Sequence, residues 1–99
     1  MILTTTNSIE GHPIIDYLGI VSGVSMNYQK GAMTFNMKKF YSALSDEVKV
    51  LKEQAFQELK QHASELKANA VVGISVDVEI STSGSITASV TGTAVKVQV

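Results

Sequence analysis

The chain contains no cysteine and no tryptophan, and it has one proline among 99 residues. Without cysteine there can be no disulfide, no thiolate nucleophile and no cysteine-based zinc site. Basic residues are not in excess either, since eight Lys and Arg stand against nine Asp and Glu, for a net charge of −1. The sequence therefore lacks the positive field that drives binding to phosphate backbones, and we expect no nucleic-acid partner.

Long apolar runs are also missing. No run approaches the ~20 residues that a membrane-spanning helix needs, and the N-terminus lacks the basic start and apolar stretch of a signal peptide. We therefore expect no membrane partner and a cytoplasmic location. The hydrophobic share is 44% and the charged share is 17%, the latter below the usual ~25%. This composition predicts one folded domain over residues 1–99, with a surface partly covered by partners.

Periodicity and turn residues predict the order of elements. In sequence order we expect strands over residues 2–6 and 14–24, a loop over 25–36, a helix over 46–67, and strands over 70–80 and 86–99. The helical period already begins at Met37, but Ser45 before Asp46 and Glu47 is typical of an N-cap. A break near residues 42–45 is thus the alternative to a continuous helix. In the second strand, Leu18, Ile20 and Val24 are expected to share one face.

The last two strands carry the clearest patterns, joined by a hairpin turn at 81–85. Alternating apolar residues predict one buried face for the first of them: Val72, Ile74, Val76, Val78 and Ile80. In the final strand the apolar parity changes after Val90, which predicts a β-bulge around residues 92–94. We expect this strand to be a sheet edge, with only Lys96 to protect it, and Val95 and Val97 to lie near a subunit interface.

The predicted fold is α+β, with two layers: a small antiparallel sheet covered by one long helix. The uncovered face would carry small hydroxyl side chains, namely Ser75, Thr87, Ser89, Thr91 and Thr93. Such a face can lie in water, line a channel or contact another chain. Free strand edges on a small domain favour self-association.

Three stretches resemble the YbjQ-like family of uncharacterised bacterial proteins, often labelled putative heavy-metal-binding. They are YLGIVSG at 17–23, ANAVVGI at 68–74 continued by Asp77 and Glu79, and GTAVKV at 92–97. The resemblance implies a dodecin-like strand–helix–strand–strand subunit and a ring-shaped homo-oligomer, a pentamer. The chain departs from the family pattern at Val24 and Ser75, where the family commonly has Glu and Asp, and at 26–41, which replaces a glycine-rich segment.

Two sets of residues are candidate metal ligands. Asp77 and Glu79 share a strand face and could hold a divalent ion between strands or subunits; oxygen ligands without thiolates suit magnesium, calcium or manganese. Glu58, His62 and Glu65 share a helix face, as in metal-binding bundles. The alternative for both sets is a solvated surface. His12, between Gly11 and Pro13, is interpreted as a turn residue.

Support for catalysis is absent from the motifs, because neither histidine lies in a nucleophile motif and no phosphate loop is present. The apolar and aromatic residues within 26–41 form either an adaptable binding surface or an arm packed at an interface. The sequence therefore favours a non-catalytic, ring-forming protein with a structural or small-ligand-binding role, the ligand being unspecified. A metal-binding module and an enzyme with an inter-subunit site are the alternatives.

Overall fold

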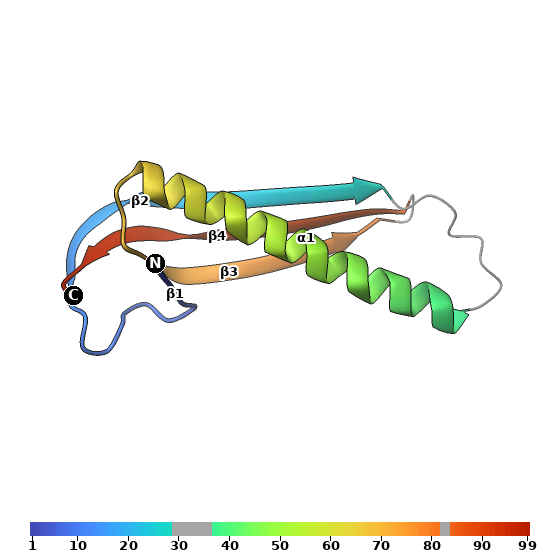
Figure 1. Ribbon diagram of the computed structural model, residues 1–99, viewed down its shortest axis with the longest axis horizontal. Helices are drawn as coiled ribbons and strands as arrows, with labels where there is room; N and C mark the ends of the chain where they lie inside the picture. Colours follow the sequence, from blue (N-terminus) through green and yellow to red (C-terminus); the bar gives the residue numbers. More distant parts are fainter. Residues whose placement is uncertain (29–36, 82–83) are drawn as a thin grey trace.

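A single helix lies across one face of a four-stranded sheet in the computed structural model, which describes residues 1–28, 37–81 and 84–99 (Figure 1). The elements are β1 (Ile2–Leu3), β2 (Ile14–Tyr28), α1 (Met37–Glu65), β3 (Ala70–Ile80) and β4 (Ser85–Val97). The strand order is β1-β3-β4-β2. This confirms the two-layer α+β fold. The sheet is mixed rather than wholly antiparallel, because β1 runs parallel to β3.

The helix α1 is continuous from Met37, so the break near 42–45 and the N-cap at Ser45 are wrong. Leu51, Ala55, Leu59 and Ala63 are buried at four-residue steps and form its inner face. The two alanines allow a close approach to the sheet. At Gly23 of β2, a Cβ atom would lie 1.9 Å from the Ala55 carbonyl oxygen, so α1 rests directly on the backbone of that strand.

At its C-terminus α1 ends in a Schellman motif around Lys67, which has φ of 63°. The Ala68 amide donates to the Ala63 carbonyl at 3.0 Å, and the Lys67 amide donates to Ser64 at 2.9 Å. The next residue, Asn69, binds the backbone of β4: its Oδ1 accepts from the Val97 amide at 2.7 Å and its Nδ2 donates to the Val97 carbonyl at 2.9 Å. This turn directs the chain into β3.

The strand β2 is longer than predicted and runs to Tyr28. Residues 25–28 are therefore strand rather than loop, and 29–36 lie outside the described residues. Side chains at the end of β2 bind α1: Ser25 Oγ donates to Gln54 Oε1 at 2.6 Å, and Asn27 donates to Glu47. Register shifts precede Gly19, and Leu18 packs against the helix-side core. It therefore does not share a face with Ile20 and Val24.

The strand β4 is central, between β3 and β2, and not an edge. Its predicted bulge is also wrong, because the register shifts place the extra residues on the partners: on β2 before Gly19, and on β3 between Val72 and Ser75. The change of parity has another cause. Residues 86–94 of β4 bury their even-numbered side chains against α1.

Towards the end of β4 the burial moves to the other face of the sheet. Val95 and Val97 are buried there with Ala70 and Val72, beneath the partly buried Ile9 and Ile14. These two valines thus belong to a second core within the chain rather than to a subunit interface. The N-terminal segment that covers them is held at the edge of β3, where the Gly73 amide donates to the Thr6 carbonyl at 2.8 Å.

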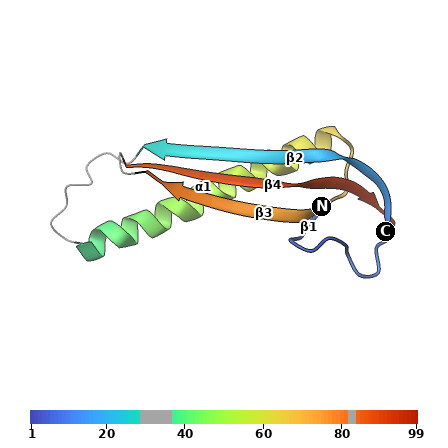
Figure 2. The same ribbon diagram turned by 180° about the vertical axis from the view of Figure 1, so that it is seen from behind.

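The molecule is long and thin, with extents of 54 × 22 × 16 Å. Both termini and the end of α1 lie at one end (Figure 2). The β3–β4 hairpin lies at the other end, where the Ser81 amide donates to the Ser85 carbonyl at 2.9 Å, as the predicted turn requires. No helix in the described ranges combines the length and apolarity needed to cross a membrane.

Candidate functional site

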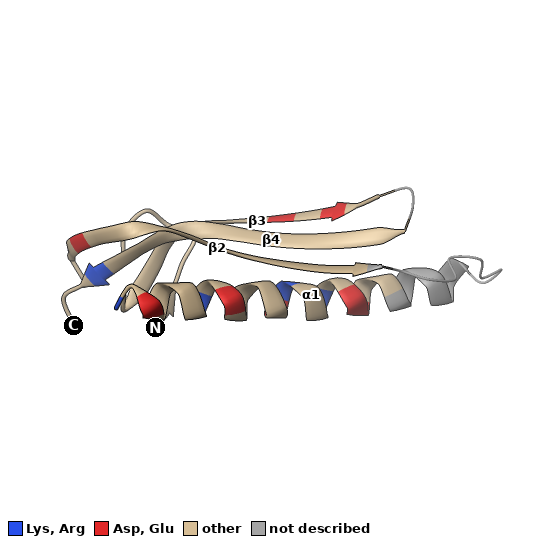
Figure 3. Ribbon diagram, turned by 90° about the horizontal axis from the view of Figure 1, so that it is seen from above, with Lys and Arg blue, Asp and Glu red and all other residues tan. Residues whose placement is uncertain are grey.

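One predicted ligand pair, Asp77 and Glu79, belongs to the outer half of β3, where Figure 3 shows acidic residues, and the register with β4 places the pair on the face of the sheet opposite α1. Both residues are exposed, and they are two residues apart on the strand, so they point to the same side. Their partners across the ladder are Ser89 and Thr87 of β4. The structure thus brings together two carboxylates and two hydroxyl groups, all oxygen donors, which is a surface suited to a hard cation.

The hydroxyl face predicted from the sequence is present around this pair. Ser75 lies opposite Thr91 on β4, and Thr91 lies opposite Ser22 on β2. Along the odd-numbered positions of β4 the hydroxyl side chains range from half-buried to exposed. Along β4 this face is therefore polar and uncharged, with the two carboxylates beside it on β3.

The second predicted ligand set, Glu58, His62 and Glu65, lies on α1 beside the edge of β2. His62 Nδ1 lies 2.8 Å from the Ser22 carbonyl oxygen, so this nitrogen carries the proton and donates. A histidine oriented in this way has Nε2 available, as metal-binding histidines do. In the part of the chain that the structure describes, however, no three acidic or histidine side chains come close enough to hold an ion.

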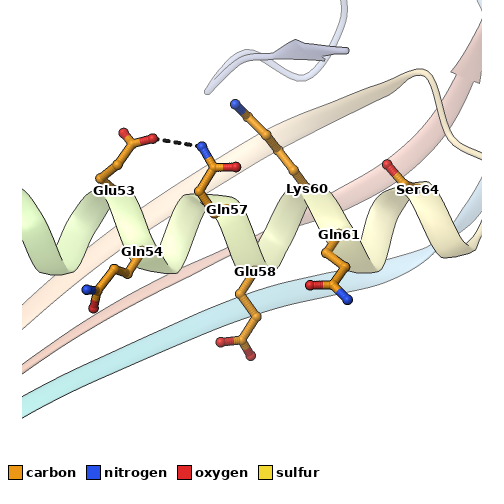
Figure 4. A pocket seen from close by; sticks show the side chains of 7 residues that line it. All are labelled: Glu53, Gln54, Gln57, Glu58, Lys60, Gln61 and Ser64. Carbon is orange, nitrogen blue, oxygen red and sulfur yellow. Dashed lines mark hydrogen bonds between the residues drawn. The ribbon is translucent and has the colours of Figure 1, made fainter.

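A shallow hollow runs along the outer surface of α1, as Figure 4 shows. The side chains that line it are Glu53, Gln54, Gln57, Glu58, Lys60, Gln61 and Ser64. Gln57 Nε2 donates to Glu53 Oε1 at 2.8 Å. Gln54 and Glu58 project to one side of the helix while Lys60 and Ser64 project to the other (Figure 4). The groups diverge, so the hollow has the character of an ordinary polar helix surface.

His12 occupies the turn position that the sequence predicted. Its amide donates to the Ile9 carbonyl at 3.1 Å, and its ring Nδ1 lies 2.9 Å from the Gln98 carbonyl oxygen. Together with the Gln98 amide, which donates to Pro13 at 2.9 Å, this contact ties the N-terminal segment to the end of the chain. The role of His12 in the structure is to close the second core.

Sequence reasoning missed a different surface, formed by apolar side chains on the edge strand β2 and on the outer half of β3, which β1 does not reach. The alternating pattern in β3 predicted one continuous buried face, but only Val72 and Ile74 are buried, and the bulge at Gly73 places them in different cores. Val76, Val78 and Ile80 are 38–54% exposed. On β2, Ile20, Val24 and Met26 are 51–80% exposed. One sequence signal could have revealed these exposed residues: the strands contain more apolar positions than one helix can cover.

Comparison with known proteins gives the family. A family model described as "Putative heavy-metal-binding", YbjQ_1, matches residues 1–98. A UPF0145 protein of Corynebacterium jeikeium is 40% identical, and one of Pseudomonas putida is 35% identical, each over 99% of this chain and 100% of its own length. One of Halalkalibacterium halodurans is 38% identical over 99% of this chain and 97% of its own length.

A solved structure shares the fold. It is a protein of unknown function of the DUF74 family from Pediococcus pentosaceus, with a TM-score of 0.57 and 22% identity, over 99% of this chain and 98% of the other. The residues that carried the resemblance lie at positions that define this fold: Gly19 and Gly23 in β2, Asn69 before β3, and Gly92 in β4. The chain belongs to the YbjQ-like family of uncharacterised bacterial proteins.

Proposed function

We propose that this protein is a non-catalytic subunit of a homo-oligomer, with a structural or small-ligand-binding role. The observation that carries the proposal is the set of exposed apolar side chains on β2 and on the outer half of β3. On β3, Val76, Val78 and Ile80 are 38–54% exposed, and five apolar side chains on β2 are 51–80% exposed, namely Ile15, Tyr17, Ile20, Val24 and Met26. Exposed apolar groups gathered on sheet edges are typical of protein–protein contact.

The size of the surface supports the same proposal. The accessible surface is 6582 Å², whereas a folded monomer of 10.6 kDa is expected to expose about 5,500 Å². The radius of gyration is 16.5 Å, against about 13 Å for a compact domain of this length. The excess surface is similar to the ~800 Å² that each partner buries in a stable interface. A net charge of −1 adds little repulsion between copies.

A ring is the form of assembly that the family resemblance implies, with five subunits. Each histidine uses Nδ1 to contact a backbone carbonyl, that of Gln98 for His12 and that of Ser22 for His62. Neither contact places a hydroxyl nucleophile beside an imidazole, the arrangement that activates serine or threonine.

A second candidate function is the binding of a divalent cation. It is favoured by Asp77 and Glu79, which point to the same side of β3, and by the description of the family model that the chain matches. Two carboxylates of one chain do not complete a coordination sphere of six to eight oxygens. Copies of the chain would therefore have to share the ion. The ligands are oxygen atoms, so magnesium, calcium or manganese suits them better than a soft metal.

Native mass spectrometry, with and without a chelator, tests both proposals. We expect an oligomer whose mass is a whole-number multiple of the 10.6 kDa chain mass, and five times that mass for the expected pentamer. The chelator should leave this mass unchanged. A monomer at all protein concentrations would refute self-association. Cation binding would be established by two results together. The parent would carry added mass that the chelator removes, and the Asp77→Asn/Glu79→Gln double variant would carry no such mass.

A further inference from the structure

Six of the exposed apolar residues, three on β3 and three on β2, form two stripes that lie on opposite edges and opposite faces of the sheet. The β3 stripe consists of Val76, Val78 and Ile80, and the β2 stripe consists of Ile20, Val24 and Met26. The register fixes the face of each. Members of the β3 stripe lie opposite the core residues Val90, Ala88 and Ile86, so this stripe is on the helix side.

The β2 stripe lies on the other face. Its members are opposite Thr93, Ser89 and Thr87 of β4, the hydroxyl positions of the uncovered side. The path of α1 explains this difference. The helix rests on β2 at Gly23 and is bonded to it through His62, Gln54 and Glu47. It therefore covers the helix side of β2, while β3 lies further from it (Figure 3).

This arrangement decides between two ways of assembling. A two-fold contact joins a patch to the same patch of a second copy. If β3 stripes paired with each other, the β2 stripe would stay exposed, and a second, unrelated interface would be needed to cover it. One head-to-tail contact, in which a β3 stripe meets a β2 stripe, covers both stripes in every copy.

We infer that copies of this chain associate head to tail, with the β3 stripe of one copy packed on the β2 stripe of the next. The inference rests on the proposed self-association and names the surfaces that carry it. The stripes have comparable lengths, about 13 Å from residue 76 to 80 and about 20 Å from 20 to 26, at ~3.3 Å per strand residue. Repetition of one such contact generates a closed ring or an open filament.

The chemistry around the stripes fits this contact. The six residues opposite them in the ladder are Val, Ala, Ile, Thr or Ser, and none is charged. The acidic residues of β3, Asp77 and Glu79, alternate with its stripe and point to the face that carries the β2 stripe, one strand beyond Ser89 and Thr87. The two stripes themselves are therefore apolar, and the carboxylates lie on β3 beside the β2 stripe rather than within it.

Two single variants and their mixture test the inference. Val78→Lys disrupts the β3 stripe and leaves the β2 stripe intact; Ile20→Lys does the reverse, at a side chain that is 80% exposed. We expect each variant alone to be a folded monomer in native mass spectrometry and light scattering. An equimolar mixture should give a heterodimer and nothing larger, because only one intact stripe of each kind remains per pair.

The possible outcomes distinguish a failure of this inference from a failure of the proposed self-association. Val50→Lys, at a helix position that is 50% exposed and outside both stripes, should keep the parent's mass. A parent that is itself monomeric overturns both the proposed function and the inference. A parent that assembles overturns only the inference if either variant forms homodimers alone, keeps the parent's mass, or fails to pair in the mixture. If Val78→Lys does not fold, Ile80→Lys, at a more exposed member of the same stripe, replaces it.

Discussion

The two ends of the sheet are covered differently, although the same strand, β4, runs through both. At the end that holds the termini, which we call the closed end, α1 lies on one face and the N-terminal segment lies on the other, over Val95 and Val97. At the open end, residues 85–91 of β4 have α1 on one face and nothing described on the other. Apolar patterning in a strand thus reports what covers each face, and it can change side without any irregularity in the backbone.

Placing a charge at equivalent positions of the two ends should give the largest difference. Thr91 and Val97 lie on the same face of β4, but Thr91 is exposed and Val97 is 2% exposed. Val97→Lys must bury or expel an ammonium group, and we expect it to destabilise the fold by about 3 kcal/mol or more. Thr91→Lys should cost less than about 0.5 kcal/mol.

Circular dichroism and amide hydrogen exchange at one protein concentration would measure this difference. Val97→Lys should lose much of the native signal, while Thr91→Lys should keep it. Equal native signals for the two variants would show that the N-terminal segment does not cover the closed end in solution, and the comparison between the ends would then fail.

Gly92 lies where the two ends meet, and enlarging it should have an intermediate effect. A Cβ atom there would be 2.6 Å from Val71 Cγ1 and 3.0 Å from Ile74 Cγ1. We expect Gly92→Ala to cost about 1–3 kcal/mol by overpacking. Val71→Ala removes the atom in closest contact, so the double variant should be more stable than the sum of the two single effects predicts.

Urea unfolding of the four proteins at a fixed concentration would give this coupling energy. Strictly additive effects would mean that Val71 is not what limits the space at Gly92. Because Ile74 remains close in the double variant, full recovery is not expected. A partial recovery would show that the junction of the two ends is closely packed around Gly92.

The sequence predicted the elements better than it predicted what covers them. The turn at Asn69, the hairpin at Gly84 and the long helix follow from local signals of capping, turns and period, and these survive in the structure. Three other features do not follow from local signals, because each depends on which strand lies beside which. They are the bulge at Gly73, the central position of β4 and the exposed β3 stripe. Ser45 was misread as an N-cap because its local signal was outweighed by a continuous helix.

The candidate site shows the same division. That Asp77 and Glu79 share a face follows from their spacing alone, and the structure confirms it. That His62 binds the Ser22 carbonyl could not be foreseen, since the contact joins residues forty positions apart and requires α1 to rest on Gly23. The two apolar stripes could not be predicted for a related reason. The sequence shows which strand positions are apolar, but only the path of α1 decides whether those side chains are covered.

The smallest predicted effect concerns Lys67, where α1 ends at the closed end. Its φ of 63° costs a residue with a side chain about 1–2 kcal/mol relative to glycine, and the added freedom of glycine in the unfolded chain returns about 0.5–1 kcal/mol of this. Lys67→Gly should therefore stabilise the protein by about 0.5–1 kcal/mol. Lys67→Ala removes the same charge and keeps the strain, so it serves as the matched control and should give no gain. A higher urea midpoint for glycine but not for alanine would show that the closed end retains strain despite being covered on both faces, because the Schellman turn needs a left-handed residue whatever packs around it.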